Sequence, residues 1–285
     1  MKFSFISLFT KLTLATSVAG ALVGCDEPTY PTPTPVTESS VGQSRVLVVN
    51  AAPGTTGTSI TLDNTAFGTP LPYLGASAAT SIPAGLRLFI YSEPTNIPAT
   101  PVVTPPPAVP LPVVTVARPV VARTAFLGGT NYTIFLTDAP TRAYANPVTA
   151  TSDQGGIRTL TLTDNLAAPT AGTAKIRFVN LAPSGTYGIF NTTMVPAGTS
   201  LFPAVPTRAY RGLTSGTGSA LVTFANFTEV AAGSYTLDVR STATTPLAGT
   251  QQVITLVAGK IYTLYTRGIA GNTTTPLGIS VVTHN

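Results

Sequence analysis

Apolar and polar side chains alternate in short stretches along most of the chain. Ile176 and Phe178 alternate with Lys175 and Arg177. This period-two pattern is typical of a strand with one buried face, and it places Lys175 and Arg177 on the polar side. Gly or Pro interrupts almost every stretch that could sustain a helix. The pattern therefore predicts a protein built from short β-strands.

The sequence also repeats itself once. RVLVVNAAPG at residues 45–54 corresponds to KIRFVNLAPS at residues 175–184, and GGTNYTIF at 128–135 corresponds to AGKIYTLY at 258–265. Both pairs are offset by 130 positions. Because a shared offset at two distant places indicates an internal duplication, we expect two homologous domains.

The two domains are expected at residues 44–166 and 173–285, each with the size of a small β-sandwich. The predicted fold class is all-β: two tandem immunoglobulin-like antiparallel β-sandwich domains. Residues 94–119 form a proline-rich insertion in the first domain, and its prolines exclude a central strand. Two interpretations stay open for it: an edge connection packed on its own sandwich, or an apolar strip that docks another surface protein.

Residues 1–24 have the layout of a secretory signal, with a basic start and an apolar run too short to span a membrane. The run ends in Leu22, Val23, Gly24 and Cys25. This ending resembles the lipobox of bacterial lipoproteins, in which the thiol receives a diacylglycerol and the chain is cleaved before the cysteine. The resemblance predicts lipidation of Cys25, the one cysteine of the chain. An ordinary secretory signal and a retained amino-terminal helix are the alternatives.

Residues 25–43 follow as a tether rich in Pro and Thr, which favours an extended polyproline conformation. Through Cys25 the membrane is the expected partner. We expect a lipid-anchored protein in the cell envelope of a Gram-negative bacterium, with the outer membrane or cell surface favoured over the inner membrane.

Charged residues make up only 9% of the 285 residues, against about 25% in a typical domain. Without residues 1–24, thirteen cations face ten anions, and no basic run argues for nucleic-acid binding. One Cys and one His exclude a disulfide framework and a Cys-rich metal site. We expect His284 to be a solvated terminal residue. No cofactor, metal ligand or catalytic residue is predicted, so we do not expect an enzyme.

Six carboxylates fall in turns or on strands with no spacing that argues for a catalytic pair. They are Asp63, Asp138, Asp153, Asp164, Glu229 and Asp238. An unrecognised hydrolase is the more distant alternative. Carbohydrate binding usually needs an exposed aromatic platform, and the chain has no Trp. Tyr187 and Tyr210, on loops of the second domain, are therefore the candidate ligand-binding residues.

Residues 175–183 (KIRFVNLAP), the turn AGSY at 232–235 and residues 256–264 (LVAGKIYTL) resemble the domain of unknown function 4397. That family occurs in exported bacterial proteins, often lipoproteins with tandem copies, including many from Bacteroidetes. The resemblance covers the second domain well. In the first it is weaker, because residues 45–50 lack the second basic residue.

The family carries no established catalytic residues, so the resemblance implies fold and location only. Our main interpretation is a non-catalytic cell-envelope lipoprotein with structural, adhesive or protein-interaction roles. A cell-surface protein or a glycan is the expected partner beyond the membrane. A carbohydrate-binding surface module is the alternative function.

Overall fold

The computed structural model describes residues 42–100, 116–145, 153–193, 198–242 and 244–285. The first half of the described chain contains β1 (Gln43–Asn50), β2 (Ser59–Leu62), β3 (Thr65–Ala66), β4 (Thr80–Pro83), β5 (Gly85–Ser92), β6 (Val120–Phe126), β7 (Asn131–Thr137) and β8 (Arg158–Asp164). The second half contains β9 (Thr173–Asn180), β10 (Gly188–Asn191), β11 (Thr199–Ser200), β12 (Thr214–Ser215), the 3-10 helix η3 (Gly218–Ala220), β13 (Val222–Thr223), β14 (Thr228–Ala231), β15 (Gly233–Arg240), β16 (Gln252–Leu256), β17 (Ile261–Arg267) and β18 (Gly278–Thr283).

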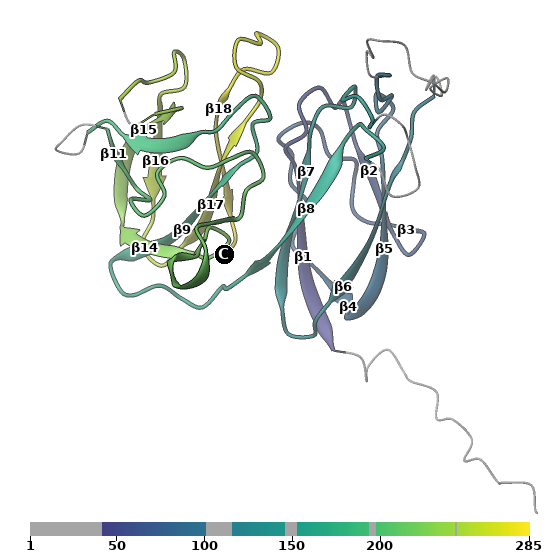
Figure 1. Cartoon of the computed structure of the whole chain (residues 1–285). Helices are drawn as coiled ribbons and strands as arrows, with labels where there is room; N and C mark the ends of the chain where they lie inside the picture. The colour runs from purple at the N-terminus through teal and green to yellow at the C-terminus, as the bar shows by residue number, and fades with distance from the viewer. Residues whose placement is uncertain (1–41, 101–115, 146–152, 194–197, 243) are drawn as a thin grey trace, which may run out of the picture. The chain divides into compact units, whose positions relative to one another are not determined.

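Each half is a β-sandwich of two four-stranded sheets (Figure 1). The strand orders are β4-β1-β7-β8 and β3-β2-β5-β6 in the first sandwich, and β14-β9-β17-β18 and β11-β10-β15-β16 in the second. Apolar side chains from both sheets of a sandwich meet in its core, as Val48 and Ile134 meet Phe89 in the first. The expected fold class of two tandem β-sandwich domains is confirmed.

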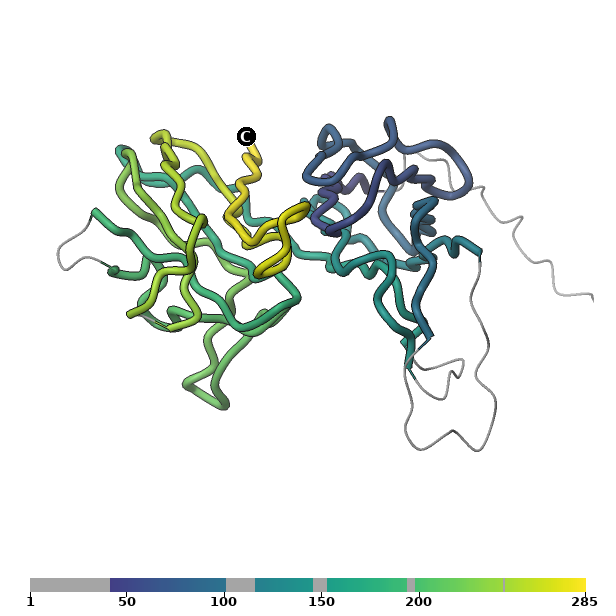
Figure 2. The backbone as a smooth tube through the Cα atoms, turned by 90° about the horizontal axis from the view of Figure 1, so that it is seen from above, coloured from purple at the N-terminus to yellow at the C-terminus, as the bar shows by residue number. Residues whose placement is uncertain are grey.

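The two sandwiches share one strand order and one register, and no described sheet contains strands from both. The backbones of the two sandwiches form two separate lobes in Figure 2. Val48 pairs with Ile134 between β1 and β7, and Phe178 pairs with Leu264 between β9 and β17. These pairs reproduce the offset of 130 positions found in the sequence. Both pairings are parallel, whereas every other pairing between named strands is antiparallel. The expected antiparallel arrangement therefore holds except between β1 and β7 and between β9 and β17.

A third apolar cluster joins the two sandwiches. Leu47, Val49 and Phe135 come from the first sandwich, and Val179 and Tyr265 come from the second. The rings of Phe135 and Tyr265 lie 5.4 Å apart. The central strands are therefore buried on both faces, which the period-two pattern did not predict.

Arg177 is fully buried, which corrects its expected place on the polar side of β9. That side of the strand is covered by groups from other segments. The Nη2 atom of Arg177 lies 2.5 Å from Asp164 Oδ1, and its guanidinium carbon lies 4.5 Å from the Phe227 ring centroid. A charged residue in an alternating strand indicates a solvent-exposed face only when no other segment packs against that face.

The proline-rich insertion of the first sandwich lies in the connection between β5 and β6, which runs from residue 93 to residue 119. The equivalent connection between β15 and β16 is shorter, from residue 241 to 251. Residues 101–115 lie outside the described part, so neither interpretation of the insertion is tested.

The limits of the domains stay a prediction, because residues 38–285 form one compact unit that contains both sandwiches. β1 begins at Gln43, which is the last residue of the expected tether and the one before the expected start of the first domain. Among the described residues, no helix has the length and apolar character needed to cross a membrane.

Candidate functional site

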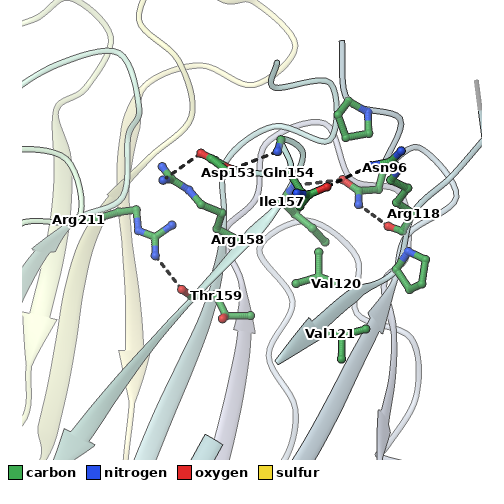
Figure 3. Close-up of a pocket in the computed structure, with 13 residues that line it drawn as sticks. Asn96, Arg118, Val120, Val121, Asp153, Gln154, Ile157, Arg158, Thr159 and Arg211 are labelled. Atoms are coloured by element: carbon green, nitrogen blue, oxygen red, sulfur yellow. Dashed lines mark hydrogen bonds and ion pairs between the residues drawn. The ribbon is translucent and has the colours of Figure 1, made fainter. Parts of the chain in front are cut away.

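A pocket of about 580 Å³ lies beside the start of β6 and the start of β8 (Figure 3). Its wall includes Arg118, Val120 and Val121 from the β5–β6 connection and β6, and Arg158 from β8. A further arginine, Arg211, comes from the second sandwich. A concave site of this size with a few charged groups over an apolar wall is a suitable place for a small ligand.

Asn96 holds the two described ends of the β5–β6 connection together. Its side chain is buried, and its amide group donates a hydrogen bond to the carbonyl of Arg118. Arg118 N–H donates back to the carbonyl of Asn96 at 2.9 Å, and Ile157 N–H donates to Asn96 Oδ1 at 3.0 Å. The backbone of Arg118 is therefore fixed at the rim of the pocket while its side chain extends from it.

A turn at residues 153–156 supplies the opposite rim. The guanidinium of Arg142 binds both carboxylate oxygens of Asp153, at 2.5 and 2.8 Å, and donates to the carbonyl of Gly156 at 2.9 Å. The hydrogen bond from Arg142 lowers the pKa of Asp153 to about 2. Asp153 is therefore a carboxylate at neutral pH, and its charge is largely matched by Arg142.

Behind this turn, Asp138 is almost fully buried, with a side-chain exposure of 1%. Arg158 binds it through Nε at 2.8 Å and Nη2 at 3.1 Å. Arg142 and Arg211 also approach it, at 3.5 and 3.2 Å. Burial opposes ionisation of Asp138, but the hydrogen bonds and charge of Arg158, together with Arg142, outweigh burial and hold its pKa below the ordinary value.

The balance of charge around the pocket is positive. Arg118, Arg142, Arg158 and Arg211 face two carboxylates, which leaves a net charge of +2. Within the described part of the chain, Arg118 makes no ion pair, and its Nη1 donates a hydrogen bond of 3.4 Å to Gln154 Oε1. Guanidinium groups bind carboxylates in a two-pronged manner, so this pocket can receive an anionic group over an apolar wall.

The described residues contain no group of three His, Cys, Asp or Glu side chains close enough to hold a metal ion. The carboxylates that looked scattered in the sequence do meet in one case. Asp138 and Asp153 share the arginines Arg142 and Arg158.

Neither tyrosine is the exposed platform that we expected. Tyr187 is 5% exposed and packs in the core of the second sandwich, because its backbone bridges to Arg208 and turns the ring inward. Tyr210 is half-buried and its hydroxyl is buried. Burial and the neighbouring Asp138 raise the pKa of Tyr210 to about 12.

The expectation for His284 is also wrong. Its side chain is 2% exposed, because its backbone continues the pairing of β18 with β17 through a hydrogen bond to Ile261. The imidazole Nε2 lies 2.8 Å from Thr263 Oγ1, and Nδ1 lies 3.6 Å from Asp164. Burial, reinforced by Arg177 and only partly offset by Asp164, lowers the pKa of His284 to about 4.

The lipobox residues Leu22, Val23, Gly24 and Cys25 lie outside the described residues, so their prediction stands untested. The pocket residues carry no signal that sequence reasoning could have used. They come from four separate segments, and each arginine taken alone looks like an ordinary surface charge.

The family model for the domain of unknown function DUF4397 matches residues 44–186. The chain belongs to this family. The match spans the first sandwich and continues through β9, so it covers the part in which the sequence resemblance was weaker. A search of curated proteins finds no match.

A solved structure from Bacteroides uniformis, provisionally assigned to cell adhesion, is similar at 11% sequence identity. The similarity covers 88% of this chain and 99% of that one, with a TM-score of 0.17. A likeness this low carries no argument about fold or function.

Proposed function

We propose that this DUF4397 protein is a non-catalytic lipoprotein of the cell envelope, whose two sandwiches form a stiff body for structural, adhesive or protein-interaction contacts. The membrane is its first partner, through a lipid on Cys25. The observation that carries the proposal is the way in which the two sandwiches are joined, because a body that projects from a membrane and bears load must not bend freely at its middle.

The junction combines apolar and ionic contacts. Besides the shared apolar cluster, Arg177 of the second sandwich pairs with Asp164 of the first at 2.5 Å, with both side chains buried. Arg177 also donates to the carbonyl of Thr163 at 3.0 Å, and Arg211 donates to the carbonyl of Thr159 at 2.7 Å. Directional bonds at two places along β8 oppose both sliding and twisting, which supports the stiff body.

The anchoring part of the proposal is tested in intact cells. Metabolic labelling with a fatty acid should label the protein, and Cys25→Ser should abolish the label and release the chain from the membrane fraction. Labelling with a reagent that cannot enter cells then separates the cell surface from inward-facing sites. A wild-type chain that carries no lipid would refute the anchor.

The adhesive part needs a separate measurement. Cells that carry the anchored protein should adhere to a host or bacterial surface more than cells that express Cys25→Ser at equal levels. Equal adhesion of the two strains would remove adhesion from the proposal and leave a structural role.

Carbohydrate binding is the second candidate function. Because neither tyrosine is an exposed platform, we place the proposed binding site in the pocket beside β6 and β8 instead. The positive pocket favours an acidic sugar, because guanidinium groups prefer carboxylates. Arg118→Gln should then weaken binding of a galacturonate trisaccharide about tenfold or more. Arg123→Gln is the matched control, since Arg123 is exposed on β6 and does not line the pocket. Equal loss in both variants, or equal binding of a neutral trisaccharide, would count against this candidate.

A further inference from the structure

Another cavity, of about 310 Å³, lies in the second sandwich and shares no lining residue with the pocket beside β6 and β8. Its wall is made largely of apolar side chains, including Phe202, Val205, Val222 and Phe224. One cation, Arg208, also lines it. Arg208 is only 6% exposed, so its charge is removed from water.

The duplicated sequence shows how unusual this arginine is. In the second sandwich Arg208 bridges to Tyr187 and its carbonyl accepts a hydrogen bond from Asn180. In the first sandwich Leu71 takes the same place, since it bridges to Thr58 and its carbonyl accepts from Asn50. A core leucine in one copy therefore corresponds to a buried cation in the other.

Three aromatic rings surround the guanidinium. Its carbon lies 4.3 Å from the centroid of Phe224, 4.7 Å from that of Phe202 and 5.0 Å from that of Phe178. Rings bind the flat faces of a guanidinium, so they leave its N–H edges to other partners. Nη1 donates to the carbonyl of Phe178, while the buried Nε has no acceptor within the described structure.

No carboxylate of the described chain neutralises Arg208. Each of the seven acidic side chains there is bound to other groups: Asp63, Glu93, Asp138, Asp153, Asp164, Glu229 and Asp238. Burial lowers the pKa of Arg208 to about 10, so the group still carries its charge at neutral pH. A buried charge without an opposite charge beside it is destabilising.

We propose that the cavity beside Arg208 binds a small organic carboxylate with an apolar carbon skeleton. The carboxylate accepts hydrogen bonds from the free guanidinium edge at Nε, and the skeleton packs against Phe202, Phe224 and Val222. The ligand thus supplies the missing negative charge, and the aromatic rings select against strongly hydrated anions. This site is separate from the pocket beside β6 and β8, and it does not depend on lipid anchoring.

The proposal is tested with 3-phenylpropionate and its amide, which differ in charge but hardly in shape. Binding to the full chain carrying Cys25→Ser is measured by calorimetry, together with the shift in the thermal unfolding midpoint. The acid should bind and raise the midpoint, and the amide should bind about tenfold more weakly or worse.

Arg208→Leu installs the residue of the first sandwich, and it should reduce acid binding at least about tenfold. Without ligand its unfolding midpoint should not fall, because an unpaired buried charge has been removed. Arg123→Leu, which deletes an exposed cation on β6, is the matched control and should bind the acid like the parent chain. If Arg208→Leu does not fold, Arg208→Lys keeps the charge but loses the Nε edge, and should weaken acid binding several-fold.

Three results would overturn the proposal. The acid and the amide could bind equally, which would make the cavity a merely apolar site. Acid binding could survive Arg208→Leu or Arg208→Lys unchanged. The acid could also fail to bind at about 10 mM, in which case the aromatic rings alone stabilise Arg208 and its role is structural.

Discussion

At the scale of single residues, Glu93 shows how a buried carboxylate can be stable without a cation. Its exposure is 2%, and both of its oxygens accept hydrogen bonds. Thr56 and Thr95 each donate through the backbone N–H and the hydroxyl, and Gly57 and Thr58 donate one bond each, at distances of 2.8 to 3.4 Å. Burial opposes ionisation, but these hydrogen bonds outweigh it and lower the pKa of Glu93.

Replacing Glu93 with Gln should therefore destabilise the first sandwich although the two side chains have nearly the same shape. Three of the donors are backbone N–H groups, which cannot turn away from the new amide N–H₂ group. We expect a loss of about 2 kcal/mol in the free energy of unfolding, measured by chemical denaturation. Glu229→Gln is the control on an exposed carboxylate and should leave stability nearly unchanged. Equal effects of the two substitutions would contradict this account.

At the scale of elements, strand β8 lies at the edge of its sheet, and edge strands expose unpaired carbonyls that can pair with other chains. Here the second sandwich covers two of them. Arg211 binds the carbonyl of Thr159, and Arg177 binds that of Thr163. The edge is thus closed by side chains instead of by another strand.

The turn before β8 depends on a glycine. Gly156 has φ of +67°, and a Cβ atom there would lie 2.2 Å from Asn96 Oδ1. Gly156→Ala should therefore displace Asn96 and lower the free energy of unfolding by more than about 2 kcal/mol, as measured by denaturation. Gly129→Ala is the matched control, because Gly129 has a similar φ of +74° but open space around it. Its cost should be the backbone strain alone, about 1 kcal/mol. If both substitutions cost the same, the contact with Asn96 has no importance.

The sequence predicted where the strands lie, but it did not predict which strand faces other segments bury. Alternation at residues 175–178 and the repeat located β9 and its counterpart β1 correctly, since both signals are local. The burial of Arg177 depends on Asp164, which belongs to the other sandwich, and on Phe227, which lies far along the chain. The pocket arginines are likewise joined only by folding, so no spacing in the sequence could predict the site.

At the scale of the whole molecule, a buried polar network joins the two sandwiches. Asp164 accepts hydrogen bonds from Thr133 of its own sandwich at 2.6 Å and from Arg177 of the other at 2.5 Å. Arg177 Nε donates to Thr263 Oγ1 at 2.8 Å, which leaves the Thr263 hydroxyl free to donate to His284 Nε2. His284 is then neutral with its proton on Nδ1, on the side of Asp164.

This arrangement makes the stability of the junction sensitive to acid. His284 has a folded pKa of about 4, against an ordinary value of 6.5. Between these values the unfolded chain binds a proton that the folded chain does not, so the free energy of unfolding falls as the pH falls from about 6.5 to about 4. The shift corresponds to a loss of about 3 kcal/mol across this window, and no further loss from His284 at lower pH.

His284→Gln isolates this contribution, because glutamine keeps a polar group near Thr263 but does not titrate. The free energy of unfolding is measured by urea denaturation at several pH values from 7 to 4 for both chains. The parent chain should lose about 3 kcal/mol more than the variant over this range, since acidic groups elsewhere titrate equally in both. Parallel pH profiles for the two chains would show that His284 is protonated within the folded junction, and that its burial between Arg177 and Asp164 does not keep it neutral.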